Sequence, residues 1–291
     1  MMIFALLAQT FRIAMPYLFA SAGGVVSERA GLIALTLEGY MLNAAFCAAL
    51  GSYFADSALA GILAGVAGGT ATALLYGVCC IRYRANQVVV GIAINLLAIG
   101  LTRFFLRLTF DSSSNSPRIE GFTERGTGLA ALVQNPLVWL GVLSLPAVWW
   151  LLYRTPFGLR LRAVGEHPEA ALSVGVPVQR VRWVAVALSG ALAGLGGTYL
   201  AFDQHQFTDS MTAGRGFIAL AATIFGRWEP KLVAIACLLF AAAETLQIHL
   251  QSAQLVPAQF VEMIPYLLTI IALAGVVARA VPPAALGKVY E

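Results

Sequence analysis

Residues 155–182 read TPFGLRLRAVGEHPEAALSVGVPVQRVR and form a long polar and basic stretch between two apolar segments. With Arg154 just before it, this stretch carries five arginines against two glutamates, Glu166 and Glu169. Loops on the cytoplasmic side of a membrane protein carry an excess of Lys and Arg. The stretch, called the central segment below, therefore predicts a cytoplasmic connection between two membrane helices.

The middle of the central segment has the start and stop signals of a short helix. Pro168 suits a first helical turn, where its missing N–H costs nothing, and Glu169 lies near the positive end of the helix. Gly175 is a natural terminator shortly before Pro177. These residues predict an ordered helix from Pro168 to Val174 on which a partner could push. An ordinary basic loop is the alternative.

The composition around the central segment is that of a membrane protein. The 291 residues are 59% hydrophobic and 11% charged, against about 25% charged in a soluble domain. A helix needs roughly 20 residues to span the hydrocarbon core, and several uncharged runs reach or approach that length. They occupy 57–81, 85–102, 126–153 and 183–202. Because these runs do not alternate, we expect an all-α protein, with 1–291 forming one membrane domain.

We expect a polytopic bundle of about 8–9 membrane segments that includes broken or re-entrant helices. The expected full helices lie at about 3–26, 32–54, 58–81, 87–108, 136–153, 181–202, 231–250 and 260–278, and a shorter stretch lies at 212–226. The uncharged run 216–226 is half a membrane thickness, and Glu38-Gly39 is the expected interruption of the second helix. The fragments GLIAL (31–35) and GFIAL (216–220) resemble each other weakly. Paired interruptions mark the substrate route in many transporters.

The distribution of Lys and Arg predicts which loops share a side. Arg82, the central segment, Lys231 and Lys288 are expected in the cytoplasm, with Gly165 as a position for a cytoplasmic label. Asp56 and the loop that contains Gln206 are expected outside, as is the N-terminus. Four arginines in 103–125 oppose this assignment, although nearby acidic residues nearly balance them.

Polar side chains at membrane depth usually face a bundle interior or a water-filled path. The candidates for a substrate path are Glu38, Asn43, Gln87 and Asn95. Asn43 and Asn95 have a structural alternative as interhelical hydrogen bonds. Glu38 could line a cavity or fix the break, and Glu244 could pair with a polar neighbour.

The sequence contains no pattern that predicts catalysis or nucleotide binding by this chain. It has no HExxH, no GxSxG and no GxxxxGK[ST]. The four cysteines lie inside apolar segments without metal-type spacing, so we expect no metal. A net charge of +4, placed mostly at loop ends, reflects topology and gives no reason to expect nucleic-acid binding.

Five stretches give the chain a resemblance to a known family. They are SERAGLIALTLEGYM (27–41), ANQVVVGIAINLLAIGLT (85–102), NSPRI (115–119), LRAVGEHPEAALSVGV (161–176) and MTAGRGFIALAATIFGRWEP (211–230). They resemble permease subunits of bacterial ABC importers, in the nucleoside and simple-sugar branch related to the ribose permeases. Ala34 and Thr36 depart from the family's common LINLGLEG pattern.

The resemblance implies a multi-subunit importer in the bacterial inner membrane. A second permease subunit, two ATP-binding subunits or one tandem ATPase, and an extracytoplasmic substrate-binding lipoprotein are the implied partners, so ATP would be bound by partner subunits only. LRAVGEHPEAA is similar to the family's coupling segment, which contacts the ATPase. The implied coupling residues are Gly165, Glu166, Pro168, Glu169, Ala171, Leu172 and Gly175. We expect Ala171 on the face buried against the ATPase.

The substrate path offers amides and one carboxylate without a basic cluster, which suits a neutral polar solute. We expect a nucleoside, with a simple sugar as the alternative. An ion-coupled secondary transporter is a rival from another class and would need a carboxylate site built from Glu38, Glu244 or Glu262. A purely structural membrane subunit is a third possibility.

Overall fold

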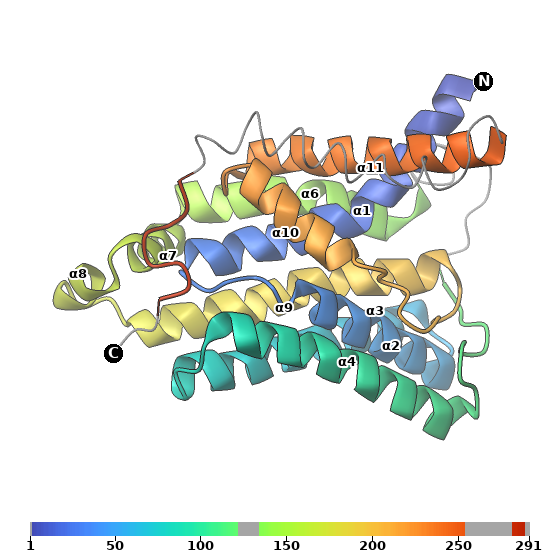
Figure 1. The fold of residues 1–291 in the computed structure, drawn as a ribbon, viewed down its shortest axis with the longest axis horizontal. Helices are drawn as coiled ribbons and strands as arrows, with labels where there is room; N and C mark the ends of the chain where they lie inside the picture. The colour runs from blue at the N-terminus through green and yellow to red at the C-terminus, as the bar shows by residue number, and fades with distance from the viewer. Residues whose placement is uncertain (1, 122–133, 254–280, 289–291) are drawn as a thin grey trace.

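The computed structural model describes residues 2–121, 134–253 and 281–288, and these residues form a bundle of helices (Figure 1). The elements are α1 (Met2–Arg29), α2 (Leu37–Ala55), α3 (Ala58–Gly77), the π-helical turn η1 (Val78–Arg82), α4 (Gln87–Phe110), α6 (Pro136–Arg154), α7 (Pro156–Glu166), α8 (Pro168–Ser173), α9 (Val178–Asp203), α10 (Arg215–Phe225) and α11 (Pro230–Ala253). Within these ranges there is no strand, only an isolated bridge between Asn115 and Thr208. The all-α prediction is confirmed.

Five of the described helices are long and apolar enough to cross a membrane. They span Ala58–Arg82, Gln87–Phe110, Pro136–Arg154, Val178–Gln204 and Pro230–Gln251. Their limits agree with the predicted segments within a few residues, because the apolar length that a bilayer demands is visible in the sequence. The segment predicted at 260–278 lies outside the described residues.

Helix α9 is the most buried of these five and packs against α1, α2 and α3. Glycines allow these helices to approach closely. A Cβ on Gly197 would lie 2.0 Å from the backbone oxygen of Met41, and one on Gly69 would lie 2.5 Å from that of Gly190. Small residues at such contacts are how membrane helices pack tightly without a hydrophobic driving force. The glycines therefore build the bundle.

The predicted interruption at Glu38-Gly39 is wrong, because α2 is continuous there, and unwound backbone instead separates α1 from α2. Residues 30–36 are unwound, and Glu38 and Gly39 belong to the first turn of α2. The second prediction holds, since α10 has 11 residues, or about 16 Å of helix against a hydrocarbon core of about 30 Å. The two similar fragments adopt different structures, because 31–35 lies in the unwound stretch and 216–220 in a helix.

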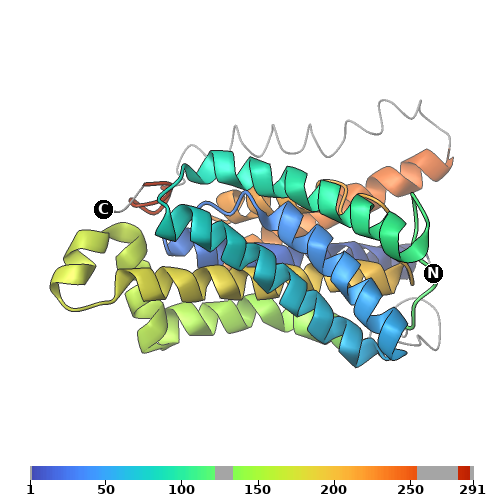
Figure 2. The ribbon, with the colours of Figure 1, turned by 90° about the horizontal axis from the view of Figure 1, so that it is seen from below.

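The central segment forms two helices where one was predicted. Helix α8 begins at Pro168 and is followed by Gly175 at φ +84°, as expected. The preceding residues form a second helix, α7, which was not predicted because the basic composition of this part is typical of a loop. Thr155 caps α7 by accepting a hydrogen bond from the N–H of Gly158, at 3.1 Å, and Pro156 opens it. Figures 1 and 2 show α7 and α8 projecting beyond the end of the bundle.

The opposite end of the bundle, where Figure 1 marks the N-terminus, contains two ion pairs. Arg12 Nε lies 2.5 Å from Asp203 Oδ1, and Arg103 Nε lies 2.8 Å from Asp209 Oδ2. Arg103 is one of the arginines that opposed an external assignment for 103–125. Its pairing with Asp209 offsets part of that positive charge.

We predict that, in a chain without native cysteines, single cysteines at Arg82, Glu169 and Lys288 react with an impermeant thiol reagent from the cytoplasm only. Cysteines at Asp56 and Gln206 should react from outside only. Glu169 replaces Gly165 as the labelling position, because a Cβ on Gly165 would lie 2.0 Å from the backbone oxygen of Arg29. Labelling of Glu169→Cys from outside would reverse the assignment.

Candidate translocation and coupling site

The unwound residues 30–36 are buried or half-buried in the bundle, and buried backbone groups need hydrogen-bond partners within the protein. Neighbouring side chains take over this role. The Ile33 N–H donates to Gln87 Oε1 at 2.8 Å, and the backbone carbonyl of Ile33 accepts from the hydroxyl of Tyr76 at 2.9 Å. Asn95 Nδ2 donates to the Leu35 carbonyl at 2.9 Å. Helices α3 and α4 thus supply partners from one side.

Helix α1 supplies partners from the other side through its last turn. Ser27 Oγ donates to the Leu32 carbonyl at 3.0 Å, and the Ala34 N–H donates to Glu28 Oε1 at 3.2 Å. Both side chains are buried. The unwound stretch is therefore an ordered connection, held by side chains from three helices.

The carboxylate of Glu38 joins the two interrupted regions. It accepts three hydrogen bonds, from Thr212 Oγ1 at 2.6 Å, the Gly214 N–H at 2.8 Å and the Gly216 N–H at 2.7 Å. Glu38 lies in the first turn of α2, and Gly216 lies in the first turn of α10. Two positive helix ends thus meet at one buried negative charge, an arrangement that both helix dipoles stabilise.

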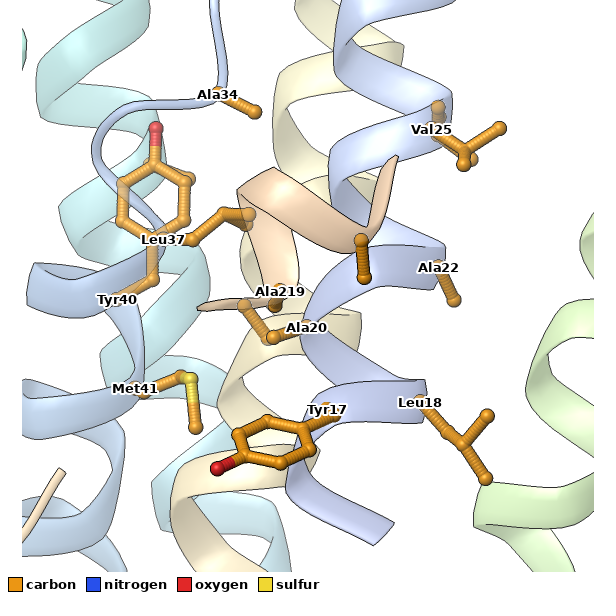
Figure 3. Packing of buried hydrophobic residues seen from close by; sticks show 14 of the residues in the cluster. Tyr17, Leu18, Ala20, Ala22, Val25, Ala34, Leu37, Tyr40, Met41 and Ala219 are labelled. Atoms are coloured by element: carbon orange, nitrogen blue, oxygen red, sulfur yellow. The ribbon is translucent and has the colours of Figure 1, made fainter. Parts of the chain in front are cut away.

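The junction at Glu38 also depends on the lack of a side chain at Gly216. A Cβ there would lie 2.4 Å from the Glu38 backbone nitrogen and 2.5 Å from its Cα. Figure 3 shows Ala219 of α10 between α1, near Ala20, and the start of α2, near Leu37. Small side chains therefore let α10 enter between α1 and α2.

The other end of α10 is attached to the end of α1. The indole Nε1 of Trp228 donates to Glu28 Oε2, and Arg29 Nε donates to the Trp228 carbonyl at 3.1 Å. Arg227 and Trp228 both have positive φ, at 53° and 56°, which non-glycine residues seldom adopt. These contacts fix an unfavourable turn, so α10 is held at both ends by residues that flank the unwound stretch.

An ion pair anchors the start of α10 to the neighbouring helix. Arg215 donates to Glu244 Oε1 on α11 at 3.0 Å, and Tyr17 on α1 donates to the other oxygen of the same carboxylate. The prediction that Glu244 pairs with a polar neighbour is confirmed. Like the Glu38 junction, this cluster links α10 to its surroundings.

The structure brings three of the four predicted path residues together. Glu38, Gln87 and Asn95 surround the unwound stretch and the start of α2, where Asn95 Oδ1 accepts from the Gly39 N–H at 2.9 Å. Asn43 instead donates to Thr72 on α3 at 3.0 Å, which is the structural alternative. Their part in a substrate path stays a prediction.

Sequence reasoning missed the partners Glu28, Tyr76, Thr212 and Trp228. Glu28 had a recognisable signal, because a charged residue at the end of an apolar helix needs a partner. The other three are residue types that are common in membrane helices and loops, and they gave no such signal. They are identified by the fold alone.

The central segment contacts the unwound stretch directly. Gly165 of α7 packs against Arg29, since a Cβ on Gly165 would lie 2.0 Å from the Arg29 oxygen. Residues 284–287 bridge the same two regions. The Ala285 N–H donates to the Gly165 carbonyl at 2.9 Å, and the Gly287 N–H donates to that of Gly31 at 3.3 Å. Motion of α7 would therefore reach residues 29–31 through contacts already in place.

The predicted coupling residues divide into an inner and an outer group. Glu166 accepts from the Ala284 N–H at 3.1 Å on the inner side. Ala171 is only 4% exposed and is buried by this chain itself, so the expectation that a partner covers it is corrected. Leu172 and Val174 are 53% and 78% exposed and form an apolar surface at α8, beside exposed Glu169.

Comparison with known proteins places this architecture in a family. Residues 6–273 match the family described as the branched-chain amino acid transport system / permease component. The chain belongs to this permease family. It is a multi-pass protein of the bacterial inner membrane, and the members of its family are components of transport systems.

Two curated relatives match the permease over nearly its whole length. The guanosine ABC transporter permease protein NupQ of Bacillus subtilis is 37% identical to the permease. The aligned region covers 95% of the permease and 93% of NupQ. The nucleoside ABC transporter permease protein NupC of Lactococcus lactis is 34% identical, covering 94% and 93%.

A solved structure supports the fold independently of close sequence similarity. It is described as an inward-facing conformation of a metal-chelate type ABC transporter. It superposes with a TM-score of 0.56 at 15% identity, covering 92% of the permease and 85% of that chain. At this identity the likeness concerns the fold.

We predict that Glu38→Leu destabilises the permease by at least about 3 kcal/mol, because it leaves three donors without their charged acceptor. The matched control is Asn43→Leu on the same helix, which removes one interhelical hydrogen bond worth about 0.6 kcal/mol. Thermal unfolding in detergent compares the two. Equal losses would mean that Glu38 does not hold α2 and α10 together.

Proposed function

We propose that the permease forms the translocation path for a nucleoside or similar neutral polar solute in an ATP-binding-cassette importer. The observation that carries the proposal is the Glu38 junction, where two interrupted segments meet inside a bundle of this family. Irregular backbone at membrane depth is tolerated where it is buried in protein or lines a cavity. The guanosine and nucleoside relatives favour a nucleoside over a simple sugar.

The family implies ATPase and substrate-binding partners. We assign ATP hydrolysis to two ATP-binding subunits or one tandem ATPase, and substrate delivery to an extracytoplasmic lipoprotein. A second permease subunit would complete the path. In this assignment the permease itself binds no cofactor.

The contacts support a direct route for coupling. An ATPase subunit that binds the exposed face of α8 would move α7 with it. Gly165 packs on Arg29, and residues 284–287 tie α7 to Gly31, so this displacement reaches the unwound stretch. Helix α10 is attached at both ends to the residues around that stretch, through Glu38 and Trp228. We infer that α10 and the start of α2 move together when access alternates.

The rival ion-coupled mechanism requires a carboxylate that can bind an ion at membrane depth. Glu38 already accepts three hydrogen bonds, and Glu244 is paired with Arg215 and Tyr17. Glu262 lies outside the described residues. The two described carboxylates thus act as structural acceptors, which favours the ATP-driven mechanism.

The substrate proposal is tested by uptake into proteoliposomes that contain the permease with its co-expressed partner subunits. We expect ATP-dependent uptake of labelled guanosine, and an excess of unlabelled ribose should not inhibit it. Vanadate should abolish uptake, and a protonophore should leave it intact. Uptake of ribose in place of guanosine would contradict the nucleoside assignment. Loss of uptake with the protonophore alone would favour the ion-coupled rival.

We predict that Leu172→Asp and Gly175→Val abolish coupling while the permease reaches the membrane at normal levels. Leu172 is exposed, so its change alters the docking face and leaves the fold intact, whereas valine cannot easily adopt φ +84° at residue 175. ATPase co-purification and guanosine uptake are the measurements. Arg160→Gln, which changes only the charge of α7, should retain uptake, and the opposite pattern would make the central segment a topology signal.

A further inference from the structure

A cluster of three cations and two aromatic rings lies at the bundle end that carries α7 and α8. The Trp149 and Tyr153 rings are neighbours on α6, with centroids 6.2 Å apart. Lys231 Nζ lies 5.0 Å and Arg154 Cζ 5.7 Å from the Trp149 centroid, and Arg162 Cζ lies 4.7 Å from that of Tyr153. The cations come from three helices, α11, α6 and α7, and are gathered by cation–π contacts.

These three cations have no acidic partner among the described residues. No carboxylate oxygen there lies within 4.0 Å of their charged nitrogens, although Glu229 is two positions before Lys231. The Nε of Arg162 is buried and donates no hydrogen bond within the described chain. A buried guanidinium donor without an acceptor is costly. The cluster therefore combines positive charge with a hydrogen-bond donor that an anion could accept from.

An apolar groove of about 340 Å³ adjoins the cluster between α6 and α11. Its lining residues are Leu145, Pro146, Trp149, Pro230, Lys231 and Ala234. Lys231 is the one charged residue in this lining and also belongs to the cluster. The groove lies along two candidate membrane spans, α6 and α11. Cationic and apolar features are thus joined in one site.

We propose that this site binds one anionic phospholipid of the cytoplasmic leaflet. The phosphate would lie among Arg162, Arg154 and Lys231, and an acyl chain would occupy the groove. Arginine and phosphate make strong charge-assisted hydrogen bonds, and basic pockets between membrane helices on the cytoplasmic side bind anionic headgroups. An acidic side chain of a partner subunit would match the cations but leave the apolar groove unfilled, so the combination favours a lipid.

The proposed lipid would connect α7 to two membrane helices. Arg162 belongs to α7, which contacts Arg29 through Gly165, whereas Arg154 and Lys231 belong to the membrane helices α6 and α11. A bound headgroup would hold α7 against the bundle and limit its freedom to tilt. This inference rests on the cluster and the groove, and it stands whether the substrate is a nucleoside or a sugar.

The test measures the phosphatidylglycerol that stays bound to the full-length permease after extraction from mixed phosphatidylglycerol and phosphatidylcholine vesicles, by native mass spectrometry. We expect retained phosphatidylglycerol in the unmodified chain and about a fivefold lower occupancy for Lys231→Gln and for Arg162→Gln. Ala234→Trp, which fills the groove and keeps every charge, should also lower occupancy. Added glycerol phosphate should not displace the lipid, because the soluble headgroup lacks the acyl chain.

The control is Arg82→Gln, which removes an exposed cation at the same end of the bundle but outside the cluster. It should leave occupancy unchanged, and thermal unfolding in phosphatidylcholine establishes that every variant is folded. Equal losses of phosphatidylglycerol occupancy for Arg82→Gln and Lys231→Gln would mean that general surface charge retains the lipid, and would overturn the site. Unchanged occupancy in Lys231→Gln, Arg162→Gln or Ala234→Trp would overturn it as well, as would displacement by glycerol phosphate.

Discussion

An unwound backbone inside a lipid-embedded bundle must find replacement hydrogen-bond partners, and the structure depends on how residues 30–36 find theirs. Bilayer hydrocarbon contains no water to satisfy backbone groups, and each unsatisfied group there costs several kcal/mol. Side chains from α1, α3 and α4 supply donors and acceptors, with Gln87 and Asn95 as the contributors from α4. The positions of these three helices are therefore linked to the interruption that they serve.

Glu38 extends this arrangement to the second interruption. One carboxylate accepts from Thr212 and from two backbone N–H groups at the start of α10. A buried charge is stable only with close partners, and here the residues at the start of α10 provide them. The consequence is mechanical, because α2 and α10 share an anchor and α10 cannot shift without disturbing the start of α2.

The end of the bundle that carries α7 and α8 has a different physical character. Gly165 contacts Arg29 by close van der Waals packing, and residues 284–287 add backbone hydrogen bonds to Gly165 and Gly31. Contacts of this kind transmit small displacements because packed interiors are stiff. The exposed Leu172 and Val174 lie on the outer side of the same unit. The exposed side of α8 and the unwound stretch are thus separated by a short chain of direct contacts.

The sequence alone determined the features that the bilayer imposes. The limits of α3, α4, α6, α9 and α11 follow from apolar length, and the 11 residues of α10 were visible as a run too short to cross. The start of α8 at Pro168 and its end before Gly175 follow from local backbone chemistry. Each of these depends on neighbours in the chain or on the solvent, so no tertiary information is needed.

Only the tertiary structure decided where the first interruption lies and what the polar residues do. Glu38 and Gly39 looked like the break because both are unfavourable inside an apolar helix, yet the helix breaks earlier, where Gln87, Tyr76 and Asn95 replace backbone hydrogen bonds. These partners are 43 to 60 positions away in the chain. Asn43 and Asn95 are the same residue type, each inside an apolar helix, and distant neighbours alone made one an interhelical contact and the other a support of the unwound stretch.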